Sequence, residues 1–305
     1  MLRSILLYLS VAGWAQRIAT RNWLARRVAR RFVAGETLEE SVTVAKALNQ
    51  DGFRVTFTYL GEAVYREEET RQVVAEYQRV NEVIARENLN AEISLKVTQL
   101  GLEIDEEICH NNLRDILNHA RERAGTRVVL DMESSPYLEA TLRLYRGLRE
   151  EFGAQVGVAI QAYLFRSAED LTQLAAPDAV IRIVKGAYLE SPAIAFDDKA
   201  KIDENYVRLV EQFLSDEGAF LDIATHDERM IAAAQRFIAA NEIPPDRYEF
   251  QMLYGIRNEL QRELVADEPT CVLISFGEEW YPYFVRRLAE RPANLVFFLR
   301  GLFGR

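Results

Sequence analysis

Near the C-terminus, four side chains have the types and the spacing needed to hold a small amino acid. They recur at steps of three and four residues, so one face of a helix would carry all of them. Arginine binds a carboxylate through two parallel hydrogen bonds, and a nearby acid would offset the second positive charge. A solvated basic face with ordinary salt bridges is the competing interpretation. The four residues are Tyr283, Arg286, Arg287 and Glu290.

A second group of polar side chains lies at the ends of short apolar segments. Lys96 alternates with Leu95 and Val97, so its ammonium should point away from the apolar face. Burying an ammonium is costly unless it is paired, which makes Lys96 a functional candidate, with a structural ion pair as the alternative. Each of the others could be only a cap or a loop contact, but together they predict a polar rim that suits an anionic cofactor. They are Asp131, Gln161, Arg182, Lys185, Thr225, His226 and Gln251.

Eight short apolar segments, separated by helical stretches, indicate the fold class. Their starts lie 23 to 40 residues apart, which is the length of one strand, one helix and their loops. Strict alternation of strands and helices implies an α/β fold with a parallel sheet. Eight such units predict that the sheet closes into a TIM-type (β/α)₈ barrel, and an open doubly wound sheet is the alternative. The segments are 53–60, 93–97, 128–132, 156–160, 180–184, 220–224, 248–252 and 271–275.

The charge distribution divides the chain into a basic start and an acidic body. Residues 1–31 contain seven arginines and no acid. The remainder has a net charge of −17, which gives the whole chain its net charge of −10. An acidic body argues against nucleic-acid binding. We therefore predict an N-terminal helical extension over 1–50 and a catalytic barrel over 51–305. The basic, amphipathic start would either pack on the barrel or contact anionic lipid at a membrane surface.

The sequence offers no standard metal or dinucleotide motif. Cys109 and Cys271 have no metal-type spacing, so we expect two buried thiols in a reducing, cytoplasmic compartment and no metal site. The three histidines are also far apart. Neither a G-x-G-x-x-G turn nor a Walker A sequence occurs. A bound dinucleotide would have to be held by the polar rim.

The order of the motifs from about residue 50 to the C-terminus resembles that of the proline dehydrogenase family. The length is similar to that of the monofunctional bacterial enzymes and leaves no room for a fused aldehyde dehydrogenase domain. The resemblance implies a distorted barrel with non-covalent FAD at the strand ends and a final helix over the barrel mouth. The matching runs are 94–101, 131–133, 161–164, 182–188, 224–227, 250–255 and 283–288.

The resemblance also implies a role for each site residue. Arg286 and Arg287 would clamp the carboxylate of L-proline or a close analogue, and Lys96 would add charge. The other substrate positions are Glu290 at the amine or the arginine pair, Asp131 as a support, and Tyr283 and Leu253 on the ring. The flavin positions are Gln161, Arg182, Lys185, Gly186, Ala187, Tyr188, Thr225, His226 and Gln251.

One position departs from the family pattern, in which a tyrosine stands in the eighth strand. Here the aligned residue is Leu273, so we expect either a different ring preference, for example for hydroxyproline, or a lower activity. The implied product is Δ¹-pyrroline-5-carboxylate, the substrate of a pyrroline-5-carboxylate dehydrogenase, and the implied electron acceptor is a membrane quinone. Two other functions remain open from the residues: a barrel lyase or aldolase with a Schiff-base lysine, or a non-catalytic sensor.

Overall fold

Eight parallel strands close into a barrel in the computed structural model, which describes residues 12–216 and 218–290, without the side chains of 18, 20, 21, 24 and 286–290. Each strand pairs with the next, and β8 returns to β1. The predicted (β/α)₈ barrel is confirmed, and the open doubly wound sheet is excluded. The strands are β1 (Arg54–Tyr59), β2 (Ala91–Lys96), β3 (Val128–Asp131), β4 (Val156–Gln161), β5 (Val180–Val184), β6 (Phe220–Ala224), β7 (Tyr248–Leu253) and β8 (Thr270–Phe276).

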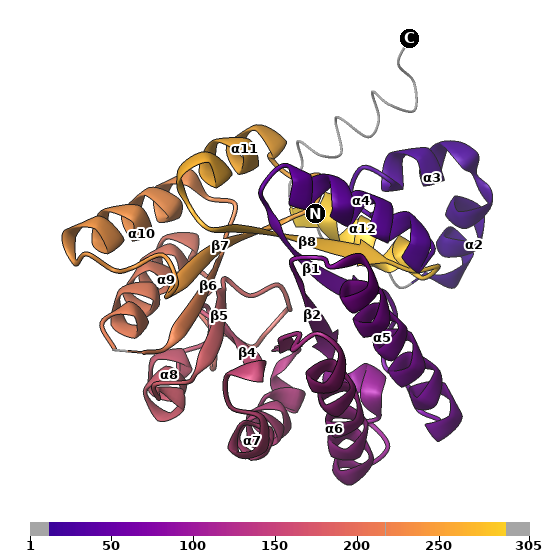
Figure 1. The fold of residues 1–305 in the computed structure, drawn as a ribbon, viewed down its shortest axis with the longest axis horizontal. Helices are drawn as coiled ribbons and strands as arrows, with labels where there is room; N and C mark the ends of the chain where they lie inside the picture. The colour runs from indigo at the N-terminus through magenta and orange to yellow at the C-terminus, as the bar shows by residue number, and fades with distance from the viewer. Residues whose placement is uncertain (1–11, 217, 291–305) are drawn as a thin grey trace.

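Helices surround the barrel and alternate with the strands (Figure 1). Several begin at acidic caps: Asp198 and Asp227 accept backbone hydrogen bonds at the starts of α9 and α10, just past β5 and β6. Among the residues described, no helix is long and apolar enough to cross a bilayer. The helices between β1 and β8 are α5 (Glu67–Glu87), α6 (Glu106–Arg123), α7 (Ser135–Phe152), α8 (Ser167–Leu174), α9 (Lys199–Leu214), α10 (Glu228–Ala240) and α11 (Asn258–Asp267), with short 3-10 turns η1 (Val97–Leu100) and η2 (Gly153–Gln155).

The barrel interior is ionic, whereas the apolar core lies between the strands and the surrounding helices. Along β2, Ile93 and Leu95 are buried in that outer core, while Glu92 and Ser94 bond to side chains from strands that are not their neighbours. Such bonds must cross the inside of the barrel. Alternation along each strand therefore sends apolar residues outward and polar residues inward.

The two ends of the described chain meet beside the barrel. Helices α2 (Gly13–Arg21) and α3 (Trp23–Ala29), which we call the N-terminal helix pair, contact the last helix, α12 (Trp280–Glu290). Figure 1 shows this yellow helix beside the indigo N-terminal helices. These helices form an apolar cluster separate from the barrel core, with Trp280 and Phe284 buried in it. The next helix, α4 (Leu38–Gln50), packs on β1 and β8 instead, and the predicted domain boundary at residue 50 stays a prediction.

Candidate active site

Arg182 on β5 is the central cation of the barrel interior. Its guanidinium is almost fully buried and donates to Ser94 Oγ at 2.5 Å and to Asp131 Oδ1 at 3.1 Å. A third bond, of 3.1 Å, reaches Glu92 Oε1 on β2. Ser94 Oγ in turn donates to Asp131 Oδ1 at 2.6 Å. The structure thus brings together Arg182 and Asp131, two residues that the sequence predicted separately.

Glu92 joins the upper and lower parts of the interior. Its Oε2 accepts from Arg127 Nε at 2.7 Å and lies 3.2 Å from Arg54 Nη2. Its Oε1 accepts from Thr56 Oγ1 at 2.8 Å and Gln251 Nε2 at 3.0 Å, as well as from Arg182. Burial would raise the pKa of this carboxyl, but the surrounding guanidiniums hold it well below its usual range. Glu92 is therefore a permanent anion.

Two further carboxylates complete the lower part of the interior. Asp222 lies 3.2 Å from Arg127, and Glu249 lies 3.4 Å from the same nitrogen. Burial and the neighbouring carboxylates raise the pKa of Asp222 well above its usual range, against the opposing effect of Arg127 and Arg182. We call this set the interior ion network. Its members are Arg54, Glu92, Arg127, Asp131, Arg182, Asp222 and Glu249.

Five members of the interior ion network are not among the site residues predicted from the sequence: Arg54, Glu92, Arg127, Asp222 and Glu249. Glu92 lies four positions before Lys96 and Glu249 two before Gln251 on the same strands, so alternation placed them on the inner face, and Asp222 is the one charged residue of β6. That position on the inner face is the signal in the sequence by which they could be recognised. Arg54 and Arg127 stand at or before the strand starts, where no motif distinguishes them from surface arginines.

Lys96 lies at the rim, at the end of β2. Its ammonium is half-buried and donates to the carbonyl of Gly61 at 3.1 Å. The neighbouring Glu133 accepts from Thr98 Oγ1 at 2.8 Å and from the Thr98 amide at 3.1 Å. Burial raises the pKa of Glu133 above its usual value. Lys96 therefore stands on the inward side of β2, as alternation predicted.

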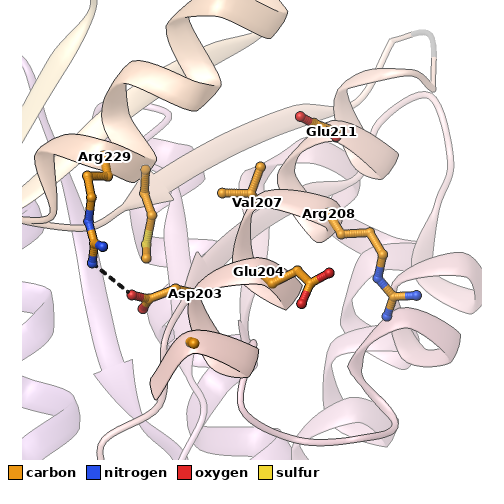
Figure 2. Close-up of a pocket in the computed structure, with 8 residues that line it drawn as sticks. Asp203, Glu204, Val207, Arg208, Glu211 and Arg229 are labelled. Atoms are coloured by element: carbon orange, nitrogen blue, oxygen red, sulfur yellow. Dashed lines mark hydrogen bonds and ion pairs between the residues drawn. The ribbon is translucent and has the colours of Figure 1, made fainter. Parts of the chain in front are cut away.

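Lys185 bridges two helix starts at the other side of the rim. Its ammonium lies 2.8 Å from Asp203 on α9 and 3.2 Å from Asp227 at the cap of α10. Beside it, a hollow of about 580 Å³ runs between α9 and α10. Figure 2 shows Asp203 and Arg229, 3.2 Å apart, at one end of this hollow and Glu211 at the other. Lys185 is thus linked through Asp203 to a groove between these two helices.

Gln161 and Gly186 form a close-packed corner between β4 and β5. Gly186 has φ +106°, and a Cβ there would approach the Tyr163 ring to 2.3 Å, so only glycine fits. Gln161 donates from Nε2 to the Met132 carbonyl at 3.1 Å, while its buried Oε1 has no hydrogen-bond partner. Next to this corner, Ala187 and Tyr188 are exposed. The corner therefore offers a ligand the free acceptor Gln161 Oε1 and, at Gly186, a backbone without a side chain.

Strands β6 and β7 place the remaining predicted residues at the same rim. His226 Nε2 accepts from the backbone amide of Leu253 at 3.2 Å, which ties the two strand ends together. Thr225 is buried, and its hydroxyl accepts from the Asp227 amide at 3.1 Å. Gln251 bonds to Glu249 at 2.8 Å and so belongs with the interior ion network. Thr225 and His226 thus lie at the strand ends, whereas Gln251 lies deeper in the barrel, against Glu92 and Glu249.

The last helix carries the predicted substrate clamp, but only its first part is described. Tyr283 is half-buried and packs against the cluster formed with the N-terminal helix pair. The bounds of α12 include Arg286, Arg287 and Glu290, whose side chains lie outside the described residues. The clamp and its position over the barrel mouth therefore stay predictions.

Among the described residues, one cluster of three side chains has ligand atoms close enough to hold a metal ion, but their pairing does not favour a metal site. Glu92, Glu249 and Cys271 place ligand atoms within 4.8 Å of one another. Both carboxylates, however, are already paired with arginines, and burial raises the pKa of the Cys271 thiol well above its usual value. Cys109 is likewise a buried free thiol, as predicted.

Comparison with known proteins identifies the family. The family model described as proline dehydrogenase matches residues 41–300. The chain is 42% identical over 304 residues to "Proline dehydrogenase 1" of Bacillus subtilis (strain 168), covering 99% of both chains, and 39% identical over 280 residues to "Proline dehydrogenase" of Deinococcus radiodurans, covering 90% of both.

Solved structures point the same way. A crystal structure of proline utilization A from Bdellovibrio bacteriovorus, inactivated by N-propargylglycine, aligns with a TM-score of 0.80 and 26% identity, covering 92% of this chain and 34% of that longer one. The barrel, the order of the rim residues and these matches agree. The chain belongs to the proline dehydrogenase family.

Proposed function

We propose that the protein oxidises L-proline to Δ¹-pyrroline-5-carboxylate with a bound FAD. The observation that carries this is the family match over nearly the whole chain, which coincides with a rim of cationic and amide side chains at the strand ends. Such rims are where barrel enzymes place their reacting groups. The flavin supplies the chemistry by accepting a hydride from the ring carbon next to nitrogen.

The rim fits a large, anionic cofactor. Gln161 Oε1 is a buried acceptor without a partner, and Gly186 allows a ligand to approach the backbone closely. The residues proposed to hold FAD are Gln161, Arg182, Lys185, Gly186, Ala187, Tyr188, Thr225, His226 and Gln251.

The substrate would lie between this rim and α12. We propose that Arg286 and Arg287 bind its carboxylate bidentately and that Lys96 adds positive charge from below. The remaining positions are Glu290 near the amine or the arginine pair, Asp131 as a support through Arg182, and Tyr283 and Leu253 against the ring. Because the substrate amine must be neutral before hydride loss, activity should rise with pH. A roof of α12 over the site would also exclude water.

Leu273 is the proposed determinant of ring preference. On β8 it is in register with Thr56 on β1, whose hydroxyl faces the interior, so the Leu273 side chain points the same way. A leucine adds no hydroxyl to the inner face. Asp131 instead draws its partners from Ser94 and Arg182. We therefore expect tolerance of substituted rings such as hydroxyproline.

We propose a membrane quinone as electron acceptor and the N-terminal helix pair as the contact with the membrane surface. Trp14 and Trp23 on these helices are 54% and 66% exposed, and arginines 17, 26 and 27 are exposed beside them. Aromatic and basic side chains together suit an anionic lipid interface. Co-sedimentation with anionic vesicles should fall in Trp14→Ala/Trp23→Ala and stay unchanged with neutral vesicles. Equal binding by both proteins would refute this contact.

The released product would pass to a separate pyrroline-5-carboxylate dehydrogenase. After hydrolysis it is an aldehyde, and an aldehyde oxidation is the reaction class that must consume it.

An absorption spectrum tests the proposed function most directly. The purified protein should be yellow, and its flavin bands should bleach when L-proline is added without an acceptor. A protein that stays colourless and inactive after FAD is added would overturn the proposal. Borohydride trapping of a carbonyl compound on Lys96 or Lys185 would point to a lyase, and flavin without turnover would point to a sensor.

A further inference from the structure

Glu92 is the most heavily bonded anion of the barrel interior, and nothing in the proposed reaction uses it directly. Three donors reach its Oε1 and two reach its Oε2, at distances of 2.7–3.2 Å. The carboxylate is completely buried. A group with this many charge-assisted bonds fixes the side chains around it.

The partners of Glu92 come from four different parts of the barrel. Thr56 and Arg54 lie on β1, Arg127 precedes β3, Arg182 lies on β5 and Gln251 lies on β7. Glu92 therefore links the cations at the base of the barrel to the one cation, Arg182, that bonds upward to Ser94 and Asp131.

The positive and negative charges of the interior ion network nearly balance. Its three arginines face three carboxylates besides Asp222, and burial raises the pKa of Asp222. Neutralising Glu92 would leave a net positive charge directly beneath Arg182. Asp222 lies 3.7 Å from Arg182, so it could ionise and compensate for the lost charge.

We propose that Glu92 is a positioning residue that acts through Arg182 to set how readily the bound flavin accepts electrons. This rests on the proposed function, in which Arg182 contacts the flavin. A fixed anion behind Arg182 offsets part of its charge and holds its guanidinium in one orientation. Electrons transferred to the flavin make its ring more negative, so uncompensated positive charge nearby favours reduction.

The test measures the midpoint potential of the bound flavin in Asp222→Asn protein, where no spare carboxyl can ionise. Adding Glu92→Gln should make the potential more positive by about 30 mV or more, which equals a tenfold change in a two-electron equilibrium. Arg127→Gln in the same background should shift it in the opposite direction and by less. The Glu92→Gln/Arg127→Gln combination restores the charge balance, so the midpoint potential should return most of the way to that of the Asp222→Asn protein.

A matched control separates this role from a structural one. Asp170 on α8 is as buried as Glu92 and is paired with Arg166 at 2.7 Å, but it lies outside the barrel interior. Asp170→Asn should lower the melting temperature without moving the potential. If Glu92→Gln does not fold, the Arg127→Gln shift alone decides the proposal.

Two outcomes would overturn the proposal. In the first, Glu92→Gln and Arg127→Gln lower the melting temperature but leave the midpoint potential of the flavin unchanged. In the second, both substitutions shift that potential in the same direction. A starting protein that binds no flavin would instead refute the proposed function, so the two failures are distinguishable.

Discussion

The barrel interior and the cluster around α12 are held together by different forces. In the interior, Glu92 and Arg182 are fixed by several charge-assisted bonds between strands on opposite sides of the barrel. At α12, Trp280 and Phe284 are buried in an apolar cluster with the N-terminal helix pair, apart from the barrel core, and Gln16 donates to Glu279 just before α12 at 2.9 Å. The proposed cofactor side is thus built into the scaffold, whereas the proposed substrate side rests on a separate apolar contact. This difference predicts that substrate affinity and barrel stability can be changed independently.

The largest effect is expected when one buried phenylalanine in each region is replaced by alanine. Phe213→Ala on α9 removes a fully buried ring from the barrel core and should cost about 3–5 kcal/mol of unfolding free energy. Phe284→Ala removes a buried ring from the α12 cluster and should mainly raise the KM for proline. Thermal unfolding and steady-state kinetics measure both. Equal loss of barrel stability in the two variants would contradict two separate regions.

Removing the clamp should affect binding and leave the barrel intact. Arg286→Ala and Arg287→Ala should each weaken binding of the substrate carboxylate by about 2–5 kcal/mol, because one charge of a buried pair loses its partner. Arg236→Ala, on the exposed side of α10, is the control for loss of an arginine. KM for proline and the melting temperature report the two effects. Unchanged affinity would refute the clamp.

A smaller effect is expected from Leu273→Tyr on the inner face of β8. An added hydroxyl that bonds to one ring and crowds another should shift the ratio of kcat/KM for proline over hydroxyproline by about 1–3 kcal/mol. Kinetics on both substrates measure this ratio. A constant ratio would mean that this position does not select the ring, and flavin content should remain unchanged in either case.

The smallest effect concerns the pH dependence of stability at Asp222. Its pKa is raised in the folded protein by burial, so the folded state prefers the protonated form. Stability should therefore fall as the pH rises above the ordinary aspartate value of about 4. Asp222→Asn should match the wild type at pH 4 and be the more stable of the two at pH 7. Parallel melting temperatures across this range would show that Asp222 ionises normally.

The fold and most of the rim could be predicted from sequence because their signals are local. Lys96 stands where alternation with Leu95 and Val97 put it, and Arg182 points inward from its strand for the same reason. The interior ion network could not be predicted as a network. Arg127 shows no pattern in its neighbourhood, and its partners lie about 35 to 122 positions away.

The sequence by itself determined the alternation of strands and helices, the inward face of each strand and the kinds of side chain at the rim. Strand and helix periods need only neighbouring residues, so they can be read along the chain. The tertiary structure alone decided that Glu92 meets three arginines, that the pKa of Asp222 is raised by burial, and that α12 packs on the N-terminal helix pair. Each of these depends on closure of the barrel, which brings distant strands and both ends of the described chain together, and on burial, which makes their charges interact strongly.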